Sequence, residues 1–429
     1  MKKEFLLVAV LLFMSALAYA QEVANLNDAE VAVAATAATP RQETTRPVSF
    51  GADGLIFSTQ DKAYRLQVHG YVQADNRMFS SNPKGEELDT FMFRRIRPNF
   101  EGTIFGHVDF RFMPDFGQNN PQIQDAYLEL KTLSFAKLRA GKYKVPIGLE
   151  ALRSDPDMSF AERSLSSDLV PLRYLGSQIG GAVLSNAISY QVGYFNGTND
   201  GSNGKMQWIQ SNEAVARVFF QPFAVSKVSA LQHLGLGVAG SAGDQHGTIA
   251  GLKTTGQSTF FKYSSTAVAD GQHNRLSPQA YYYAGPVLFL GEYVLSSQTV
   301  LNKKLTDRLR NEAWHVEGSF MLTGEKNSYN GVRPRYAFEP NRGIRHLGGV
   351  ELAIRTSELS IDKDTFPLFA NPKTSAQHAQ EWGVAVNWHL NRFVKLMTNY
   401  EHTDFRMASS KVTPLHSENV LMSRIQLAF

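Results

Sequence analysis

The sequence predicts an all-β fold, a transmembrane antiparallel β-barrel of about 16 strands with an inward-folded constriction loop. Three observations predict it. Polar and apolar residues alternate with period two in segment after segment from Tyr64 to the end of the chain. Stretches rich in Gly, Asn and Ser separate these segments, as turns and loops do. The last segment has one apolar and one polar face, and it ends on an aromatic residue, Phe429.

The chain begins with the features of an export signal. Two lysines precede an apolar run from Phe5 to Leu17, and Ala18-Tyr19-Ala20 follows as a cleavage site. The apolar run is short for a membrane-spanning helix, which needs about 20 residues. We therefore expect residues 1–20 to be a signal peptide that is cleaved before Gln21.

The region after the signal differs in amino-acid composition from the rest of the chain. Residues 21–60 are rich in Ala and Thr, and we expect a flexible periplasmic lead there, with a short helix over Asp28–Ala35 as an option. Residues 61–429 form the predicted barrel domain. This division gives one folded domain behind a signal peptide and a lead.

Composition excludes several classes of protein. Hydrophobic residues make up 43% of the chain but never fill 18 consecutive positions, which excludes a helical membrane protein. There is no cysteine, so no disulfide is possible. The net charge of +4 is not concentrated in basic segments, which argues against a nucleic-acid partner. No metal-binding or phosphate-loop motif occurs, so we expect no cofactor and no enzyme activity.

The first predicted strand shows the alternation clearly. In Tyr64–Met78, YRLQVHGYVQADNRM, the odd positions are polar or amphipathic and the even positions are mostly apolar. A soluble β-sandwich would show the same pattern, but its strands are short and share one core. Here the pattern continues for roughly 370 residues without a domain break. At about 23 residues per strand and connection, this length predicts about 16 strands.

The stretch Phe93–Phe112 places arginines on one face of the predicted strands. Ile96, Phe100 and Val108 have the opposite parity to Arg95 and its neighbours. An arginine facing lipid near the membrane midplane costs about 2–4 kcal/mol, so we expect the arginines to face the lumen. The same parity argument selects Arg65, Arg77, Arg95, Arg97, Arg111, Arg139 and Arg217.

Two residues of this stretch do not fit the alternation. Arg94 has the wrong parity for the lumen, and we expect it near a strand end, with its head bent over the rim. Pro98 removes a backbone donor from a predicted strand, and we expect a bulge or local break there.

Residues 142–176 are too long for a tight turn, and we expect them to fold into the lumen. Ser159 and Glu162 have the spacing of a capping box, which predicts a short helix starting there. Arg153, Arg163 and Arg173 lie in the segment, and acidic residues partly offset them. A solvated outer loop with balanced charge is the alternative.

The predicted lumen face carries arginine rather than lysine, and this choice indicates which class of solute the pore would take. The guanidinium group stays charged and offers a planar pair of donors that matches phosphate oxygens. Several moderate sites in a row would pass an anion along better than one deep site. Asp125 also has lumen parity; it either accepts a hydrogen bond from a protonated phosphate or forms a salt bridge with an arginine.

Several segments together resemble one known family, the phosphate-selective porins O and P. They are FRRIRPNFEG (93–102), MPDFG (113–117), QDAYLEL (124–130), LRAGKYKVPIGLEAL (138–152), FAERSL (160–165), YFNG (194–197) and LTGE (322–325). The resemblance implies a 16-stranded homotrimer in the bacterial outer membrane, with an arginine-lined pore narrowed by an inward loop, through which phosphate-type anions pass. It also implies that Arg94 belongs to a paired arginine position and that Asp125 lies beside the constriction.

The resemblance has one departure. Selective members of the family carry lysine-rich loops, whereas the predicted loop at 297–312 has only a modest cluster of Lys303, Lys304, Arg308 and Arg310 with acidic residues between them. Passive diffusion of phosphate-type anions is therefore the predicted function, with a general anion-preferring porin as the alternative. A structural or adhesive barrel that does not conduct is a further option. The expected partners are small inorganic anions, outer-membrane lipids and the barrel assembly machinery, which would recognise the strand ending at Phe429.

Overall fold

The computed structural model describes residues 47–51, 54–84, 89–133, 135–197, 211–343 and 346–429. The predicted signal peptide, the optional helix over Asp28–Ala35 and most of the predicted lead lie outside these residues. Among the described residues, no helix has the length and apolar character needed to cross a membrane.

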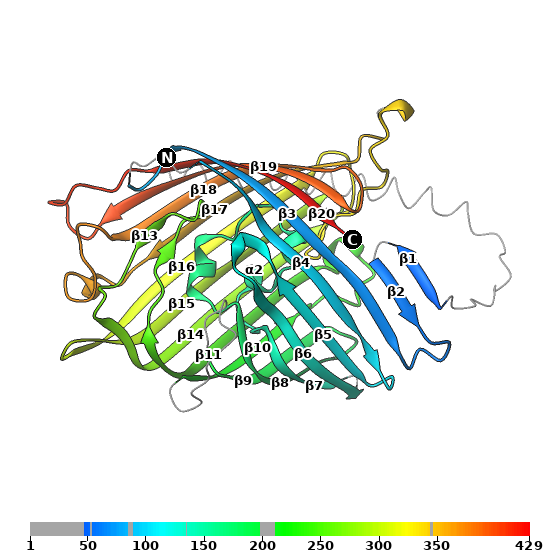
Figure 1. Cartoon of the computed structure of the whole chain (residues 1–429), viewed down its shortest axis with the longest axis horizontal. Coiled ribbons are helices and arrows are strands. Elements are labelled where there is room, and N and C mark those ends of the chain that lie inside the picture. Colours follow the sequence, from blue (N-terminus) through cyan, green and yellow to red (C-terminus); the bar gives the residue numbers. More distant parts are fainter. Residues whose placement is uncertain (1–46, 52–53, 85–88, 134, 198–210, 344–345) are drawn as a thin grey trace.

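Sixteen antiparallel strands form the closed barrel that the sequence predicts (Figure 1). Each strand pairs with its neighbour in the chain, and the last pairs with the first, which leaves no open edge. The strands are β3 (Arg65–Ser81), β4 (Thr90–Ile104), β5 (Val108–Asp115), β6 (Gln122–Leu133), β7 (Ala136–Lys144), β8 (Arg173–Val183), β9 (Ile188–Phe195), β10 (Asn212–Phe220), β11 (Leu234–Thr248), β14 (Ala267–Ala284), β15 (Val287–Asn302), β16 (Leu305–Met321), β17 (Gly349–Ser360), β18 (Ala376–His389), β19 (Val394–Met407) and β20 (Glu418–Ala428).

The chain end lies in the seam of the barrel. β20 pairs with β3 from Asn419↔Ser81 to Ala428↔Tyr71, and Phe429 exchanges both backbone hydrogen bonds with Gly70. Beyond this point β3 pairs with β2 (Gly54–Ser58), which forms a hairpin with β1 (Val48–Gly51). The part of the lead that the structure describes is therefore a β-hairpin that extends the sheet.

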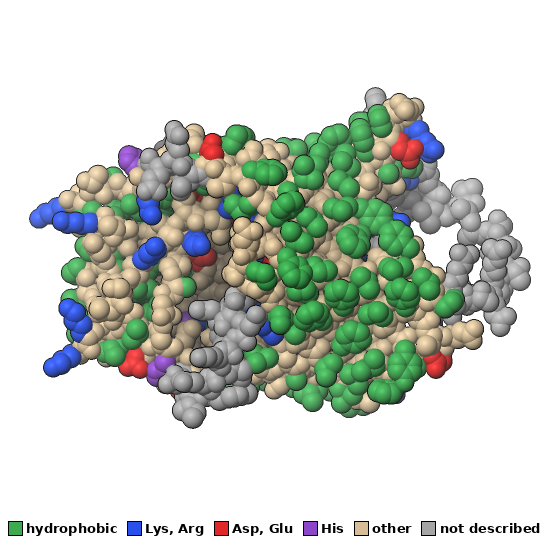
Figure 2. All heavy atoms as spheres, in the orientation of Figure 1, with side chains coloured by type: hydrophobic (Ala, Val, Ile, Leu, Met, Phe, Trp, Pro, Cys, Tyr) green, Lys and Arg blue, Asp and Glu red, His purple; other side chains and the backbone are tan. Residues whose placement is uncertain are grey.

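The two faces of the wall differ as the alternation predicts. Large apolar side chains such as Leu128, Leu138 and Ile354 are exposed on the outside, while polar residues such as Asn99 and Asn387 are buried inside. Apolar side chains gather in a broad region on one half of the view in Figure 2. This is the distribution that a lipid bilayer requires around a polar lumen.

The bulge expected at Pro98 is absent, and the irregularity lies at Arg94 instead. Pro98 stays in register opposite Gly70, where a Cβ atom would come within 3.0 Å of the Pro98 Cα atom. The missing side chain of Gly70 leaves the space that the proline needs. Next to this pair, Gln73 opposes Arg95 and Ala74 opposes Phe93, so Arg94 is the extra residue of a bulge. The bulge reverses the parity and turns Arg94 into the lumen; the expectation of a rim position was wrong.

The prediction of a loop at 297–312 is also wrong. These residues belong to β15 and β16, which are joined by only Lys303 and Lys304. Lys303 has a φ of 59°, so it takes the left-handed conformation of a tight hairpin turn. The longer connection at this end of the barrel is 249–266, which carries the short strands β12 (Leu252–Lys253) and β13 (Thr259–Phe261).

Segments enter the barrel from both ends. At one end lie tight turns such as 105–107, together with the chain terminus, and we take it as the periplasmic end. The connection 322–348 also starts at this end, and its Tyr329 hydroxyl donates to the Leu149 carbonyl at 2.6 Å. From the opposite end, residues 145–172 between β7 and β8 enter the barrel, and we call them the inward loop. This confirms the predicted inward loop.

Candidate functional site: the constriction of the barrel

The inward loop contains short helical turns but no helix at Ser159. The turns are α2 (Leu149–Leu152) and the 3-10 turns η2 (Asp155–Asp157) and η3 (Leu165–Leu169). The predicted capping box does not form: the Ser159 hydroxyl donates to Glu351 at 2.9 Å, and Glu162 turns to the barrel wall. Several guanidinium groups attract the Glu162 carboxylate more strongly than one backbone donor would.

One side of the loop is attached to an acidic wall formed by β15–β19. Glu292 on β15 accepts the backbone N–H groups of Leu149 and Glu150 at 2.7 and 3.2 Å. Arg153 forms a buried ion pair with Glu317 on β16 at 3.0 Å. The loop thus presents backbone donors and a cation to this wall, which attach it there.

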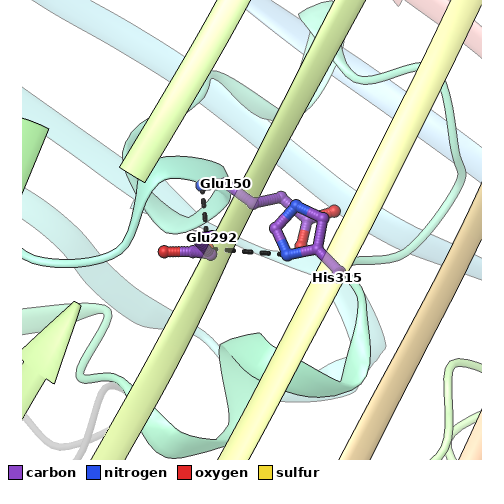
Figure 3. A group of neighbouring side chains, drawn as sticks. All are labelled: Glu150, Glu292 and His315. Atoms are coloured by element: carbon purple, nitrogen blue, oxygen red, sulfur yellow. Dashed lines mark hydrogen bonds and ion pairs between the residues drawn. The ribbon is translucent and has the colours of Figure 1, made fainter. Parts of the chain in front are cut away.

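Figure 3 shows one part of this attachment, the cluster of Glu150, Glu292 and His315. Among the described residues, these three are the one group of potential metal ligands close enough to share an ion. Their oxygens are already occupied by donors: Glu150 accepts hydrogen bonds from Ser164 at 2.9 and 2.6 Å and from Arg355 at 3.2 Å. The cluster therefore acts as an attachment of the loop, and an ion would have to displace these donors.

On its other side the loop faces a basic wall formed by β3, β4 and β20. Glu162 lies at the centre of four arginines from this wall. The distances from its carboxylate oxygens are 2.9 Å to Arg77, 2.6 Å to Arg94, 3.4 Å to Arg95 and 3.3 Å to Arg424. Four guanidinium groups thus share one carboxylate, and all lie inside the barrel.

Asp155 is a second acidic centre in the same loop. Arg97 and the Tyr71 hydroxyl donate to it at 2.6 and 2.9 Å, and Arg163 forms an ion pair with it at 2.8 Å. Arg97 also bonds Asp115 at the end of β5 at 2.7 Å. Arg94, Arg95 and Arg97 of β4 are therefore held in fixed positions by the carboxylates of the loop and of β5.

Asp125 forms salt bridges with the two arginines beside it. Its carboxylate lies 2.8 Å from Arg173 on β8 and 3.6 Å from Arg111 on β5. Of the two alternatives for Asp125, a hydrogen bond to phosphate or a salt bridge with an arginine, the structure has the salt bridge.

The remaining predicted arginines point inward but do not continue one row. Arg139 pairs with Glu129 at 2.6 Å, and its guanidinium lies 4.4 Å from the centre of the Tyr127 ring. Arg217 lies on β10 and donates to Gln279 at 3.1 Å. Arg65, near the periplasmic end of β3, donates to Gln67 on the same strand. Parity alone assigns a face and not a position along the pore.

Arg424 was missed as a site residue. It forms two bonds with Asp75, at 2.6 and 2.7 Å, besides its contact with Glu162. The signal was present in the sequence, because the alternation of the last strand places Arg424 on the polar face. Its proximity to the loop could not be read from that pattern.

Two cavities flank the loop, and both lie against the basic side of the barrel. The outer cavity, of about 330 Å³, lies on the side of the long connections. Its charged lining residues are Arg94, Arg95, Arg97, Arg163, Arg173, Lys253, Asp115, Glu162 and Asp168. The inner cavity, of about 230 Å³, lies on the periplasmic side. Its charged lining residues are Arg111, Arg139, Lys144, Arg173, Asp125 and Asp155.

Cations outnumber carboxylates in the lining of each cavity, by six to three and by four to two. Arg173 lines both cavities, and the Arg97–Asp155 ion pair connects their linings. No residue of β14–β19 lines either one. The loop therefore covers the acidic wall and leaves space beside the arginines, where a confined positive field attracts anions.

The two loop carboxylates that bind the arginines, Asp155 and Glu162, remain charged. Burial by itself would raise the pKa of Asp155 and of Glu162, but the arginines around each carboxyl group outweigh it and hold both pKa values well below the usual range. The ion pairs of the constriction are thus present at neutral pH.

We expect attachment of the loop to weaken only at strongly acidic pH. Burial raises the pKa of Glu150, but His315, Arg355 and hydrogen bonds from Ser164 lower it to about 2. Because this folded-state pKa lies below the usual glutamate value of 4.5, the ionised carboxylate stabilises the attached loop at higher pH, and the contribution is lost as the pH falls from about 4.5 toward 2. Hydrogen-exchange protection of the loop amides, corrected for intrinsic rates, should stay constant from pH 7 to 5 and fall below pH 4.5. Loss of protection already between pH 7 and 5 would contradict this, and Glu150→Gln should make the acid step smaller, with Asp155 and Glu162 responsible for the remainder.

Comparisons with solved structures return outer-membrane channels of the same fold. DcaP of Acinetobacter baumannii is 10% identical, with a TM-score of 0.57 over 87% of this chain and 99% of that chain. The trimer form of OmpT from Vibrio cholerae is 11% identical, with a TM-score of 0.55 over 86% and 100%. An anion-selective porin from Comamonas acidovorans is 10% identical, with a TM-score of 0.52 over 85% and 100%. At these identities the likeness shows the fold alone. A search of curated protein sequences gives no match.

A closed 16-stranded barrel with an apolar exterior, a charged lumen and a constricting inward loop defines an outer-membrane porin. Within this class the chain belongs to the phosphate-selective porin O and P family, whose model matches residues 66–429. The family and the fold describe a channel rather than an enzyme.

Proposed function

We propose that this porin conducts phosphate-type anions by passive diffusion through the two cavities beside the basic wall. The observation that carries this proposal is the arrangement of the constriction: the loop covers the acidic wall and both cavities lie against arginines. Arginine is suited to phosphate because its donors match two oxygens at once.

The carboxylates in the cavities define the alternative. Asp115, Glu162 and Asp168 line the outer cavity together with its cations, which leaves a moderate rather than a strong excess of positive charge. This favours a general anion-preferring porin as the second candidate.

We further propose a homotrimer, which the trimer form of the OmpT neighbour supports. Export by a cleaved signal at residues 1–20 and recognition of the terminal strand by the barrel assembly machinery complete the proposal. The position of Phe429 in the barrel seam is consistent with a role of this strand in closure.

Planar-bilayer recording tests the function. In a potassium chloride gradient the reversal potential should show preference for chloride, and millimolar phosphate should reduce the chloride current. Preference for potassium would contradict an anion channel, and absence of any conductance would indicate a structural barrel. Chloride conduction that phosphate does not reduce would establish the general anion porin.

A further inference from the structure

We propose that the inner cavity is a binding site for small organic anions that carry a hydroxyl group, such as a hydroxylated alkyl phosphate. This inference rests on the proposed function and goes beyond it, because it assigns a different solute class to a second place in the pore. It follows from the chemistry of the cavity lining, which differs from that of the outer cavity.

The outer cavity offers almost entirely polar contacts. Beside its charged residues it is lined mainly by amides and small polar groups such as Gln118, Asn120, Ser164 and Thr254, and by no aromatic residue. Such a lining suits a small inorganic anion that has only polar atoms to present.

The inner cavity combines cations with apolar surface. Tyr71, Tyr127 and Tyr143 line it, together with Met113 and Leu152. The rings of Tyr127 and Tyr143 are packed edge to face with centroids 5.7 Å apart, which fixes the orientation of both rings. A purely inorganic anion would leave this surface unused, whereas a short carbon chain would cover it.

Cationic groups lie next to the aromatic surface. The Arg139 guanidinium is 4.4 Å from the Tyr127 ring centre and 5.3 Å from the Tyr143 ring centre. Arg111 donates to Asn99 at 3.0 Å but reaches the carboxylates of Glu101 and Asp125 only at 3.6 Å, and 30% of its side chain is exposed. An acid group of a solute can therefore approach Arg111 while the carbon chain rests on the rings.

Among the described residues, three buried polar atoms in the same lining lack a hydrogen-bond partner. One of them, Asp155 Oδ1, forms an ion pair with Arg163 at 2.8 Å. The other two form no ion pair with a described residue either. They are the Tyr143 hydroxyl and the Gln178 side-chain oxygen, whose residues are 1% and 7% exposed. Buried polar atoms are nearly always paired, so these two atoms indicate a ligand or water that completes them. The phenol can donate and the amide oxygen can only accept. A solute hydroxyl both accepts and donates, so it can complement either atom.

The size of the cavity agrees with this class of ligand. Its volume of about 230 Å³ is below the range of about 300–1,000 Å³ that is usual for drug-sized ligands. It suits a compound of a few carbon atoms with one acid group.

Three probes and one conservative variant test the inference in planar bilayers. The probes are glycerol 3-phosphate, propyl phosphate, which lacks the hydroxyls, and inorganic phosphate, each added in turn to either side of the membrane. The wild-type channel should be blocked at a lower concentration by glycerol 3-phosphate than by propyl phosphate. Tyr143→Phe, which keeps the ring, should raise the blocking concentration of glycerol 3-phosphate about three- to tenfold and leave that of the other two probes unchanged.

The control is Tyr190→Phe, which removes a phenol that bonds the Phe135 carbonyl outside the lumen; it should change none of the three values. Gln178→Leu removes the other unpaired atom, and it should also raise the blocking concentration of glycerol 3-phosphate. If both lumen variants leave glycerol 3-phosphate block unchanged while chloride conduction and phosphate block persist, the inner cavity is no such site and the proposed function still stands. If wild-type protein lacks phosphate block but shows the Tyr143-dependent block by glycerol 3-phosphate, the proposed phosphate pore is wrong and the inner site remains.

Discussion

Glu162→Gln should increase the anion selectivity of the channel and loosen the inward loop. One carboxylate lies within 3.4 Å of four arginines from three strands, so its neutralisation leaves four buried cations with fewer partners. Removing one partner of a buried ion pair commonly costs about 3–5 kcal/mol. The outer cavity also gains one unit of positive charge, because Glu162 lines it.

The measurement for Glu162→Gln is the chloride-to-potassium permeability ratio in bilayers, which should rise at least about twofold, with larger fluctuations of the open current. Hydrogen-exchange protection of the loop should fall, while the attachment to Glu292 and Glu317 keeps the loop in the barrel. The matched control is Glu339→Gln, which removes an exposed carboxylate paired with Arg342. An unchanged ratio with a folded barrel would show that Glu162 does not set the field of the pore.

Replacing Arg95 and Arg97 together with alanine should reduce phosphate block about tenfold or more, because each charge-assisted hydrogen bond contributes about 1.5–3 kcal/mol. Both arginines line the outer cavity, and their partners Asp115, Asp155 and Glu162 would remain with less positive charge around them. The field at the constriction would then favour cations more than in the wild-type protein.

The blocking concentration of phosphate and the reversal potential together measure this change. A control pair with the same loss of charge is Arg392→Ala with Arg406→Ala, since both of these arginines are exposed. Equal phosphate block in the constriction variant and in the control pair would show that Arg95 and Arg97 do not contribute to anion binding in the pore. Correct assembly is checked by heat-modifiable migration in gels, because a closed barrel resists unfolding.

The wall of the barrel was predictable because the orientation of a side chain in a strand depends on its own position parity. The inward orientation of Arg77, Arg95 and Arg97 follows from that rule, as does the exposed position of Leu138. The rule fails where the pairing register shifts. Arg94 faces the lumen only because of the bulge opposite Gln73 and Ala74, and a bulge depends on how two strands pair.

The inward loop illustrates a second limit of prediction from the sequence. Its length predicted that residues 142–176 would not form a simple turn, and it folds inward. The capping-box spacing at Ser159 predicted a helix that does not form, because Glu162 bonds arginines that are distant in the chain. Local spacing describes what a segment can do alone, whereas charged groups elsewhere in the barrel compete for the same carboxylate.

The sequence by itself determined the class of fold, the approximate number of strands, the inward face of the arginines that lie in regular strands and the segment that enters the lumen, since these follow from the length and the local pattern of the chain. Only the tertiary structure decided that an acidic wall lies opposite a basic one, that Glu162 and Asp155 bind the arginines, and that two cavities of different chemistry remain beside them. These features depend on which strands face each other across a closed barrel and on where the loop comes to rest between them. Such contacts join residues that are between 58 and 262 positions apart, and no periodic pattern encodes them.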